Sequence, residues 1–140
     1  MPVFCLTADD RVNDSNGFKI IKKKEHPILE GLPWKDAPTV CGYNMVRPKD
    51  DSEVLLTLKR IESSGRDRVE EVKLSEEEHP LLAVHNYRNG RSLAFTTDVA
   101  PHWVGGMVDW GSRRININGS ELGNDYILFL QKMLKWLANE

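Results

Sequence analysis

Pro80-Leu-Leu-Ala-Val-His-Asn-Tyr-Arg-Asn-Gly-Arg-Ser-Leu-Ala-Phe-Thr-Thr-Asp-Val-Ala-Pro-His-Trp103 is a stretch that predicts a β-hairpin. Asn89-Gly90 suits a two-residue type I′ turn, because both central positions of that turn need positive φ. The turn would join strands at 81–87 and 91–97. The run from Leu81 to Val84 is apolar on both faces, as is typical of a strand that is covered from both sides. The hairpin therefore predicts a layered α/β arrangement.

Polar side chains follow the second strand of this hairpin. The apolar alternation stops at Asp98, and Pro101 breaks the chain before His102 and Trp103. Ligands of open α/β sheets bind outside the carboxyl ends of the strands. We therefore expect Asp98, His102 and Trp103 to bind a small polar ligand, with Trp103 or Trp110 as an apolar wall. The alternative is structural: Asp98 caps the next turn, His102 bonds to backbone and Trp103 fills the end of the core.

Length and composition predict one globular domain over residues 1–140, because 40% of the chain is apolar and 29% is charged. The formal charge of -2 gives no electrostatic reason to expect a nucleic-acid partner. The sequence has no apolar run of about 18 residues and no secretory pattern at its start. We therefore expect a cytoplasmic protein without a membrane or nucleic-acid partner and without a cofactor.

The two cysteines, Cys5 and Cys41, predict neither a disulfide framework nor a zinc site. A catalytic cysteine needs a lowered pKa, which a helix N-terminus or a neighbouring histidine supplies. Cys5 has no glycine turn around it, and Cys41 precedes Gly42 in a strand-like run. Both thiols are therefore interpreted as structural, and no metal site is expected.

The remaining segments before residue 80 predict short strands and loops. Residues 3–6 form a short apolar run, and strands are expected at 18–23, 39–46 and 53–59. Residues 7–17 are rich in turn formers and predict a loop, and residues 26–34 predict an irregular segment that packs on the core. Residues 61–72 are highly charged and predict an exposed excursion, with a short edge strand near 69–74.

The end of the chain predicts an amphipathic helix that packs on the sheet. Apolar residues recur there at three- and four-residue spacing: Leu122, Tyr126, Ile127, Leu130, Met133, Leu134 and Leu137. Ser120 or Asn124 would cap the helix. Phe129 and Trp136 widen its apolar surface, which favours either more core contact or a partner interface.

Several of these segments resemble the C-terminal part of a glutamine amidotransferase domain family in the class I glutamine amidotransferase-like superfamily. The resemblance runs in order through His26–Trp34, Gly42–Asn44, Glu53–Leu56, Pro80–Val84, Gly90–Trp103 and the helix around 131–137. It implies a flavodoxin-like α/β fold of which this chain holds the second half. It also implies a mixed, hairpin-rich sheet covered by the C-terminal helix, without the family's central parallel strands.

The resemblance implies a scaffold without its nucleophile. Active relatives use a cysteine in a strained, glycine-flanked turn, together with a histidine and a glutamate that follow a late strand. His102 stands roughly where that histidine would lie, but residue 104 is Val104 rather than glutamate. The missing strands leave two alternatives: either the hairpin-rich part closes a core by itself, or a partner covers the exposed sheet, as a second copy or a companion subunit would.

Three functions remain open at this point. The first is a non-catalytic binding or assembly module that self-associates or joins a companion subunit. The second is a hydrolase or amidotransferase-type enzyme that uses His102 and Asp98 with a nucleophile from a companion chain. The third is a remnant of a longer gene with little function of its own.

Overall fold

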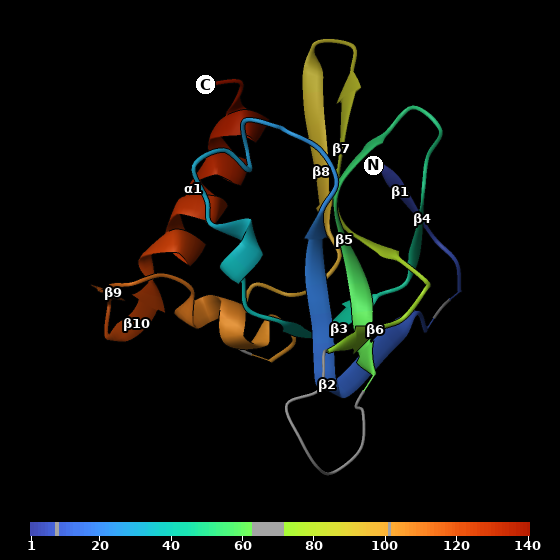
Figure 1. The fold of residues 1–140 in the computed structure, drawn as a ribbon. Helices are drawn as coiled ribbons and strands as arrows, with labels where there is room; N and C mark the ends of the chain where they lie inside the picture. The colour runs from blue at the N-terminus through green and yellow to red at the C-terminus, as the bar shows by residue number, and fades with distance from the viewer. Residues whose placement is uncertain (8, 63–71, 101) are drawn as a thin grey trace.

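The computed structural model describes residues 1–7, 9–62, 72–100 and 102–140. Its strands and helices follow one another in this order (Figure 1): β1 (Val3–Cys5), β2 (Arg11–Lys22), η1 (Trp34–Asp36), β3 (Val40–Asn44), β4 (Val46–Pro48), β5 (Glu53–Glu62), β6 (Lys73–Leu74), β7 (His79–Tyr87), β8 (Gly90–Phe95), η2 (Gly105–Asp109), β9 (Arg114–Ile117), β10 (Ser120–Gly123) and α1 (Asn124–Ala138). The elements η1 and η2 are short 3₁₀-helices.

The main sheet has the strand order β3-β2-β5-β7-β8, and β6 pairs with the end of β5. Every pairing between described strands is antiparallel. Neighbouring antiparallel strands end at opposite sides of a sheet, so their carboxyl ends share no edge. The argument that placed a ligand at such an edge therefore does not apply to this sheet, and any site after β8 has to be judged by its own geometry.

The sheet curls so that its edge strand β3 meets the segment that follows the strand at its other edge, β8. The backbone N–H of Asn44 in β3 donates to the carbonyl of Thr96 at 2.8 Å, and the N–H of Cys41 donates to the carbonyl of Trp103 at 2.6 Å. The chain after β8 thus crosses to the far edge of the sheet and covers β3. This crossing places residues 96–103 beside β3.

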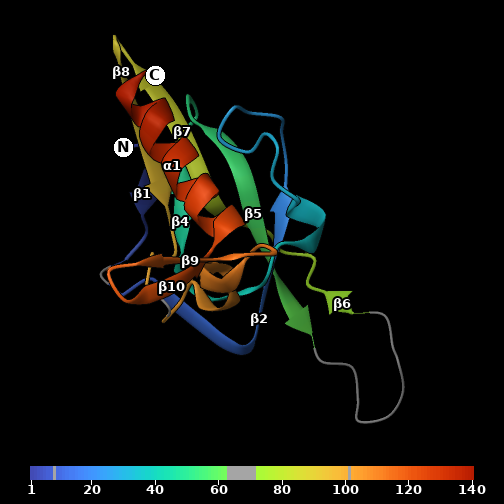
Figure 2. The same cartoon turned by 90° about the vertical axis from the view of Figure 1, so that its left-hand side faces the viewer.

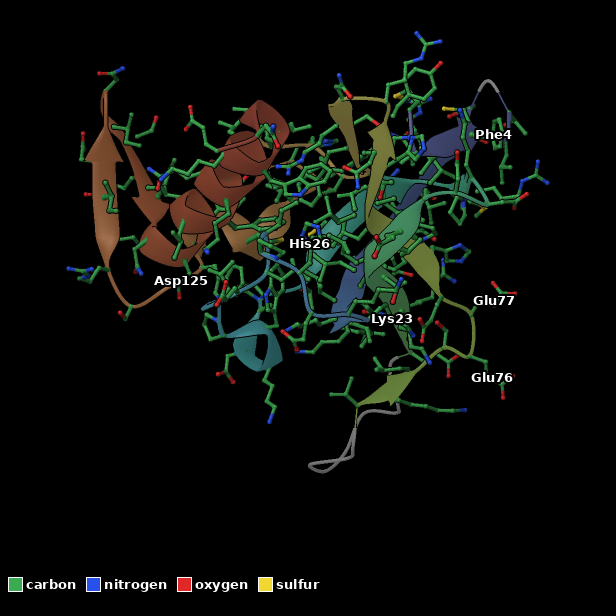
Figure 3. All side chains as sticks on the ribbon, turned by 90° about the horizontal axis from the view of Figure 1, so that it is seen from above. Phe4, Lys23, His26, Glu76, Glu77 and Asp125 are labelled. Atoms are coloured by element: carbon green, nitrogen blue, oxygen red, sulfur yellow. The ribbon has the colours of Figure 1, made fainter. Side chains whose placement is uncertain are left out.

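Two hydrophobic cores cover the two sides of β7. Leu82 and Val84 belong to the larger core, which also contains the buried face of α1. Ala83 packs instead with Val3 of β1 and Val46 of β4. Figures 2 and 3 show α1 on one side of the sheet and β1 on the other. The prediction of a strand covered from both sides is confirmed, with a two-stranded ribbon rather than a second helix on the far side.

The hairpin between β7 and β8 turns one residue earlier than the sequence predicts. Tyr87 pairs with Gly90, so Arg88 and Asn89 are the central turn residues, and Arg88 has a φ of 53°. The expected Asn89-Gly90 turn is therefore wrong. Strand register follows the pairing of core-facing side chains, because a slip of one residue would move them to the opposite face.

The strand β2 begins within the segment that the sequence assigns to a loop. Its first three residues, Arg11 to Asn13, pair with β3, and the register shifts between Asn13 and Phe18. Gly17 has a φ of 77° within this irregularity. A bulge of this kind accommodates residues that otherwise favour turns, which explains why their composition was misleading.

The helix α1 differs from the prediction in its start and in its buried face. Ser120 lies in β10, and Gly123 is the residue before the helix, with no side-chain cap. The core contains Tyr126, Phe129, Met133 and Trp136. Leu134 is 66% exposed, so part of the predicted apolar face points away from the sheet. Phe129 and Trp136 provide the extra core contact that was one of the two alternatives.

The fold is a mixed α/β arrangement in which one C-terminal helix covers a curled antiparallel sheet. The flavodoxin-like part of the prediction stays a prediction, because no parallel pair occurs among the described strands. β6 lies near the expected edge strand, while 63–71 of the charged excursion and the expected break at Pro101 fall outside the described residues. No helix in the described ranges has the length and apolarity to span a membrane.

Candidate ligand site after β8

Asp98 holds the loop that follows β8. Its carboxylate accepts the backbone N–H of Trp103 at 3.1 Å through both oxygens, and the N–H of Val104 at 2.8 Å. Val104 is fully buried and directly precedes η2. Carboxylates prefer such positions because they satisfy amides that a tight turn leaves without a backbone acceptor. The structural role predicted for Asp98 is therefore present in the fold.

His102 is poorly placed as an oriented base. Its Nδ1 lies 3.6 Å from Asp98 Oδ2, which is longer than a hydrogen bond, and 80% of its side chain is exposed. The imidazole stacks on the indole of Trp103, with ring centroids 5.9 Å apart. A general base needs a partner that fixes its tautomer and direction. Asp98 has already committed both oxygens to the loop and does not provide that orientation.

Trp103 joins the loop to β3. Its backbone carbonyl accepts the N–H of Cys41. Its indole also lies close to Gly42, because a Cβ added to Gly42 would be 2.8 Å from the indole Cδ1. The same Cβ would be 2.7 Å from Asn13 Oδ1. Gly42 therefore permits a close approach of β2, β3 and the loop. A glycine inside a strand pattern is the one sequence signal that points to this contact.

A hollow of about 430 Å³ lies beside these residues. Its walls are formed by Arg11, Asn13, Asp14 and Ser15 from β2, Cys41 from β3, and His102 and Trp103 from the loop. The structure thus brings two of the predicted site residues together with four polar residues of β2. Sequence reasoning missed those four because it assigned residues 7–17 to a loop.

Trp110 is not part of this hollow. Its side chain is buried in the larger core, and its ring centroid lies 4.9 Å from that of Trp34. Its carbonyl accepts the N–H groups of Asp125 and Tyr126 at the start of α1. The expectation that Trp110 forms a wall of the ligand site does not hold for this hollow, because the indole is buried against Trp34 in the core.

The two thiols have different surroundings. Cys5 is exposed, whereas Cys41 is half-buried and packs against Gly105, where a Cβ would lie 2.8 Å from the sulfur. Gly105 also has a φ of 55°. No hydrogen bond joins either sulfur to an imidazole in the part of the chain that the structure describes.

Tyr126 connects the loop after β8 to α1. Its hydroxyl donates to the carbonyl of Val99 at 2.9 Å. Burial, together with the nearby charge of Asp98, raises the pKa of Tyr126 to about 12. The hydroxyl therefore stays protonated at neutral pH and remains a donor, as this contact requires.

Metal binding has no visible basis around the hollow. Within the described ranges, no group of three or more His, Cys, Asp and Glu side chains could hold a metal ion. Asp14, the carboxylate in the wall of the hollow, pairs with Arg60 at 3.1 Å. The arrangement can therefore offer polar contacts and one aromatic stack to a small polar molecule.

The family described as "Putative glutamine amidotransferase" matches residues 1–118. The chain belongs to this family. The match confirms the resemblance inferred from the sequence and covers β1 to β9, including the loop that carries Asp98, His102 and Trp103. A comparison with curated proteins gives no match.

Two solved structures, both of proteins from Salmonella typhimurium, are similar to the chain. They are "Cytoplasmic Protein STM3548 from Salmonella typhimurium", at 24% identity, and "Cytoplasmic Protein STM1381 from Salmonella typhimurium LT2", at 25% identity, each with a TM-score of 0.68. Each comparison covers 98% of this chain and 43% of the other. This amidotransferase-family chain therefore spans less than half the length of these two structures.

Proposed function

We propose that this chain is a non-catalytic binding or assembly module of the amidotransferase family that acts in the cytoplasm. The observation that carries the proposal is the use of Asp98. Its carboxylate holds the amides of Trp103 and Val104 and does not orient the imidazole of His102. The cytoplasmic part is supported by the names of the two similar structures. The proposed partner is a second copy or a companion subunit, and the chain spans 43% of the length of the two similar structures.

The proposal is tested by incubating the purified chain with glutamine and measuring released ammonia. We expect no turnover above that of a Cys5→Ala, Cys41→Ala double variant. Light scattering of the same sample should report a mass above the single-chain value of 16.0 kDa, either alone or with a co-purified subunit. Ammonia release that either cysteine substitution abolishes would overturn the proposal.

A second candidate is an amidotransferase-type hydrolase that receives its nucleophile from a companion chain. It is favoured by one observation, since the imidazole of His102 is 80% exposed at the hollow and is open to a group from another chain. His102→Ala would then abolish turnover of the assembled complex without changing the melting temperature. Asp98→Asn is the matched variant, because an enzyme that used this carboxylate to orient His102 would lose activity there too.

A further inference from the structure

The outer edge of β8 has backbone groups with no partner in the described part of the chain. β8 is the last strand of the main sheet, and Thr96 just beyond it donates its N–H to the carbonyl of Leu81 in β7. Bonded pairs recur at every second residue of an antiparallel ladder. The N–H and C=O groups of Arg91, Leu93 and Phe95 therefore point outward. Such groups match the hydrogen-bonding pattern of another extended strand.

The sequence of β8 offers little protection against pairing. Natural edge strands are usually guarded by lysine, proline, a bulge or a covering segment. Residues 90–95 contain no lysine, carboxylate or proline, and the guanidinium of Arg91 is directed to the helix. Arg91 Nη1 donates to the carbonyl of Trp136 at 2.8 Å, and Arg91 Cζ lies 5.1 Å from the Trp136 ring. The opposite edge, β3, is covered by residues 96–103.

An apolar stripe of α1 lies beside this free edge. Lys132 Nζ donates to the carbonyl of Pro27 at 3.4 Å, so this side of the helix faces the segment before η1. Leu134 lies two residues later, about 200° further round the helix, and therefore on the β8 side. Figure 2 shows α1 between β8 and that segment. Leu137 continues the stripe at i+3, and both leucines are exposed, at 66% and 37%.

Val99 extends the same surface toward the start of the helix. It follows β8, is 63% exposed, and its carbonyl accepts the hydroxyl of Tyr126 in the first turn of α1. The outer edge of β8 together with Val99, Leu134 and Leu137 is called the β8–α1 surface below. It combines outward backbone groups of β8 with three exposed apolar side chains.

We propose that a second copy of this chain docks on the β8–α1 surface, with the two β8 strands paired antiparallel about a twofold axis. Such an axis, perpendicular to the sheet, places the same edge opposite itself and keeps both α1 helices on one face. The leucine stripe then meets its own copy and is removed from water, while the outward backbone groups gain partners. The inference rests on the proposed assembly role and names its partner and surface.

The test measures the mass of the full chain by light scattering over a concentration series. We expect wild type to reach twice 16.0 kDa and Leu134→Glu to return the mass to that of one chain. Val72→Glu is the matched control, because Val72 is 67% exposed and lies outside the β8–α1 surface. Leu137→Glu provides a second variant on the surface, and circular dichroism verifies that each variant is folded.

Amide exchange of wild type tests the strand pairing without any substitution. The amides of Leu93 and Phe95 should exchange more slowly as concentration rises, while those of Ile115 and Ile117 in β9 should not change. A single-chain mass at every concentration would overturn the inference, as would a dimer that survives both glutamate variants or unchanged exchange at Leu93 and Phe95. None of these results would be evidence of catalysis, so each would overturn the proposed dimer and leave the proposed non-catalytic function in place. Conversely, glutamine turnover would overturn the proposed function and leave a dimer in place.

Discussion

At the residue scale, both carboxylate oxygens of Asp98 accept hydrogen bonds from backbone N–H groups of its own loop. Asp98→Ala removes the acceptor for the N–H groups of Trp103 and Val104. We expect the free energy of unfolding to fall by about 1.5–3 kcal/mol, the usual range for hydrogen bonds to a charged group. Urea denaturation measures this change. Asp98→Asn keeps one acceptor oxygen and should lose less, whereas equal losses in the two variants would contradict the capping role.

Gly42 is the residue at which the loop, β2 and β3 approach most closely. Gly42→Ala would place a methyl group 2.7 Å from Asn13 Oδ1 and 2.8 Å from Trp103 Cδ1. We expect a loss of about 1–3 kcal/mol, as is typical when a packed site receives extra volume. Gly90→Ala is the control, because its new Cβ would lie 3.6 Å from its nearest neighbour. Thermal melts of the two variants should differ, and equal melting temperatures would contradict this contact.

At the scale of elements, α1 has more apolar side chains than the sheet can cover. Phe129→Ala should lower the free energy of unfolding by about 3–5 kcal/mol, because it leaves a cavity in the larger core. Leu134→Ala should change it by no more than about 0.5 kcal/mol in dilute monomer, because Leu134 is exposed. Chemical denaturation compares them, and a larger loss for Leu134→Ala would mean that the helix is rotated.

The buried face of α1 could not be predicted from spacing alone. The periodicity correctly indicates a helix, and it includes Tyr126 and Met133, which are buried. It does not show that the ring of Phe129 meets those of Trp34 and Phe95, with centroids 5.2 Å and 5.7 Å away. These partners lie far away in the sequence. They select the stripe that faces the sheet, and the remaining leucines are left on the surface.

At the scale of the whole molecule, His26 connects the segment before η1 to the end of α1. Its ring centroid lies 5.5 Å from that of Trp136, and its Nδ1 accepts the N–H of Ile28 at 3.2 Å. Burial lowers the pKa of His26 below its ordinary value of 6.5; Glu53 opposes this shift and Arg91 adds to it. The neutral imidazole is therefore favoured in the folded state.

The sign of the resulting pH dependence follows from proton binding. Below pH 6.5 the unfolded chain binds a proton at His26 more readily than the folded chain, so stability falls as pH drops through this range. The free energy of unfolding levels off below the pKa that His26 has in the folded chain, and it keeps its full value above pH 6.5. Denaturation at several pH values should show this step in wild type and lose it in His26→Asn. His102→Asn is the control, because His102 is 80% exposed, and identical profiles for wild type and His26→Asn would contradict the assignment.

The candidate site was predictable only in part. Asp98, His102 and Trp103 do lie in one loop after β8, as the end of the apolar alternation indicates. The sequence does not show that the carboxylate of Asp98 accepts hydrogen bonds from that loop, or that the side chain of Trp110 is buried in the core. It also does not place the polar start of β2 beside Cys41, because that contact depends on how β2 and β3 pair.

What the sequence by itself determined is the hairpin, the C-terminal helix and the family. These depend on residue spacing and on motif order, which are properties of the chain read in one dimension. Only the tertiary structure decided the hairpin register, the buried stripe of α1 and the closure of β3 by the Cys41–Trp103 hydrogen bond. Each of these depends on contacts between residues that are distant in the chain, where the packing of both partners selects one arrangement from several that local preferences allow.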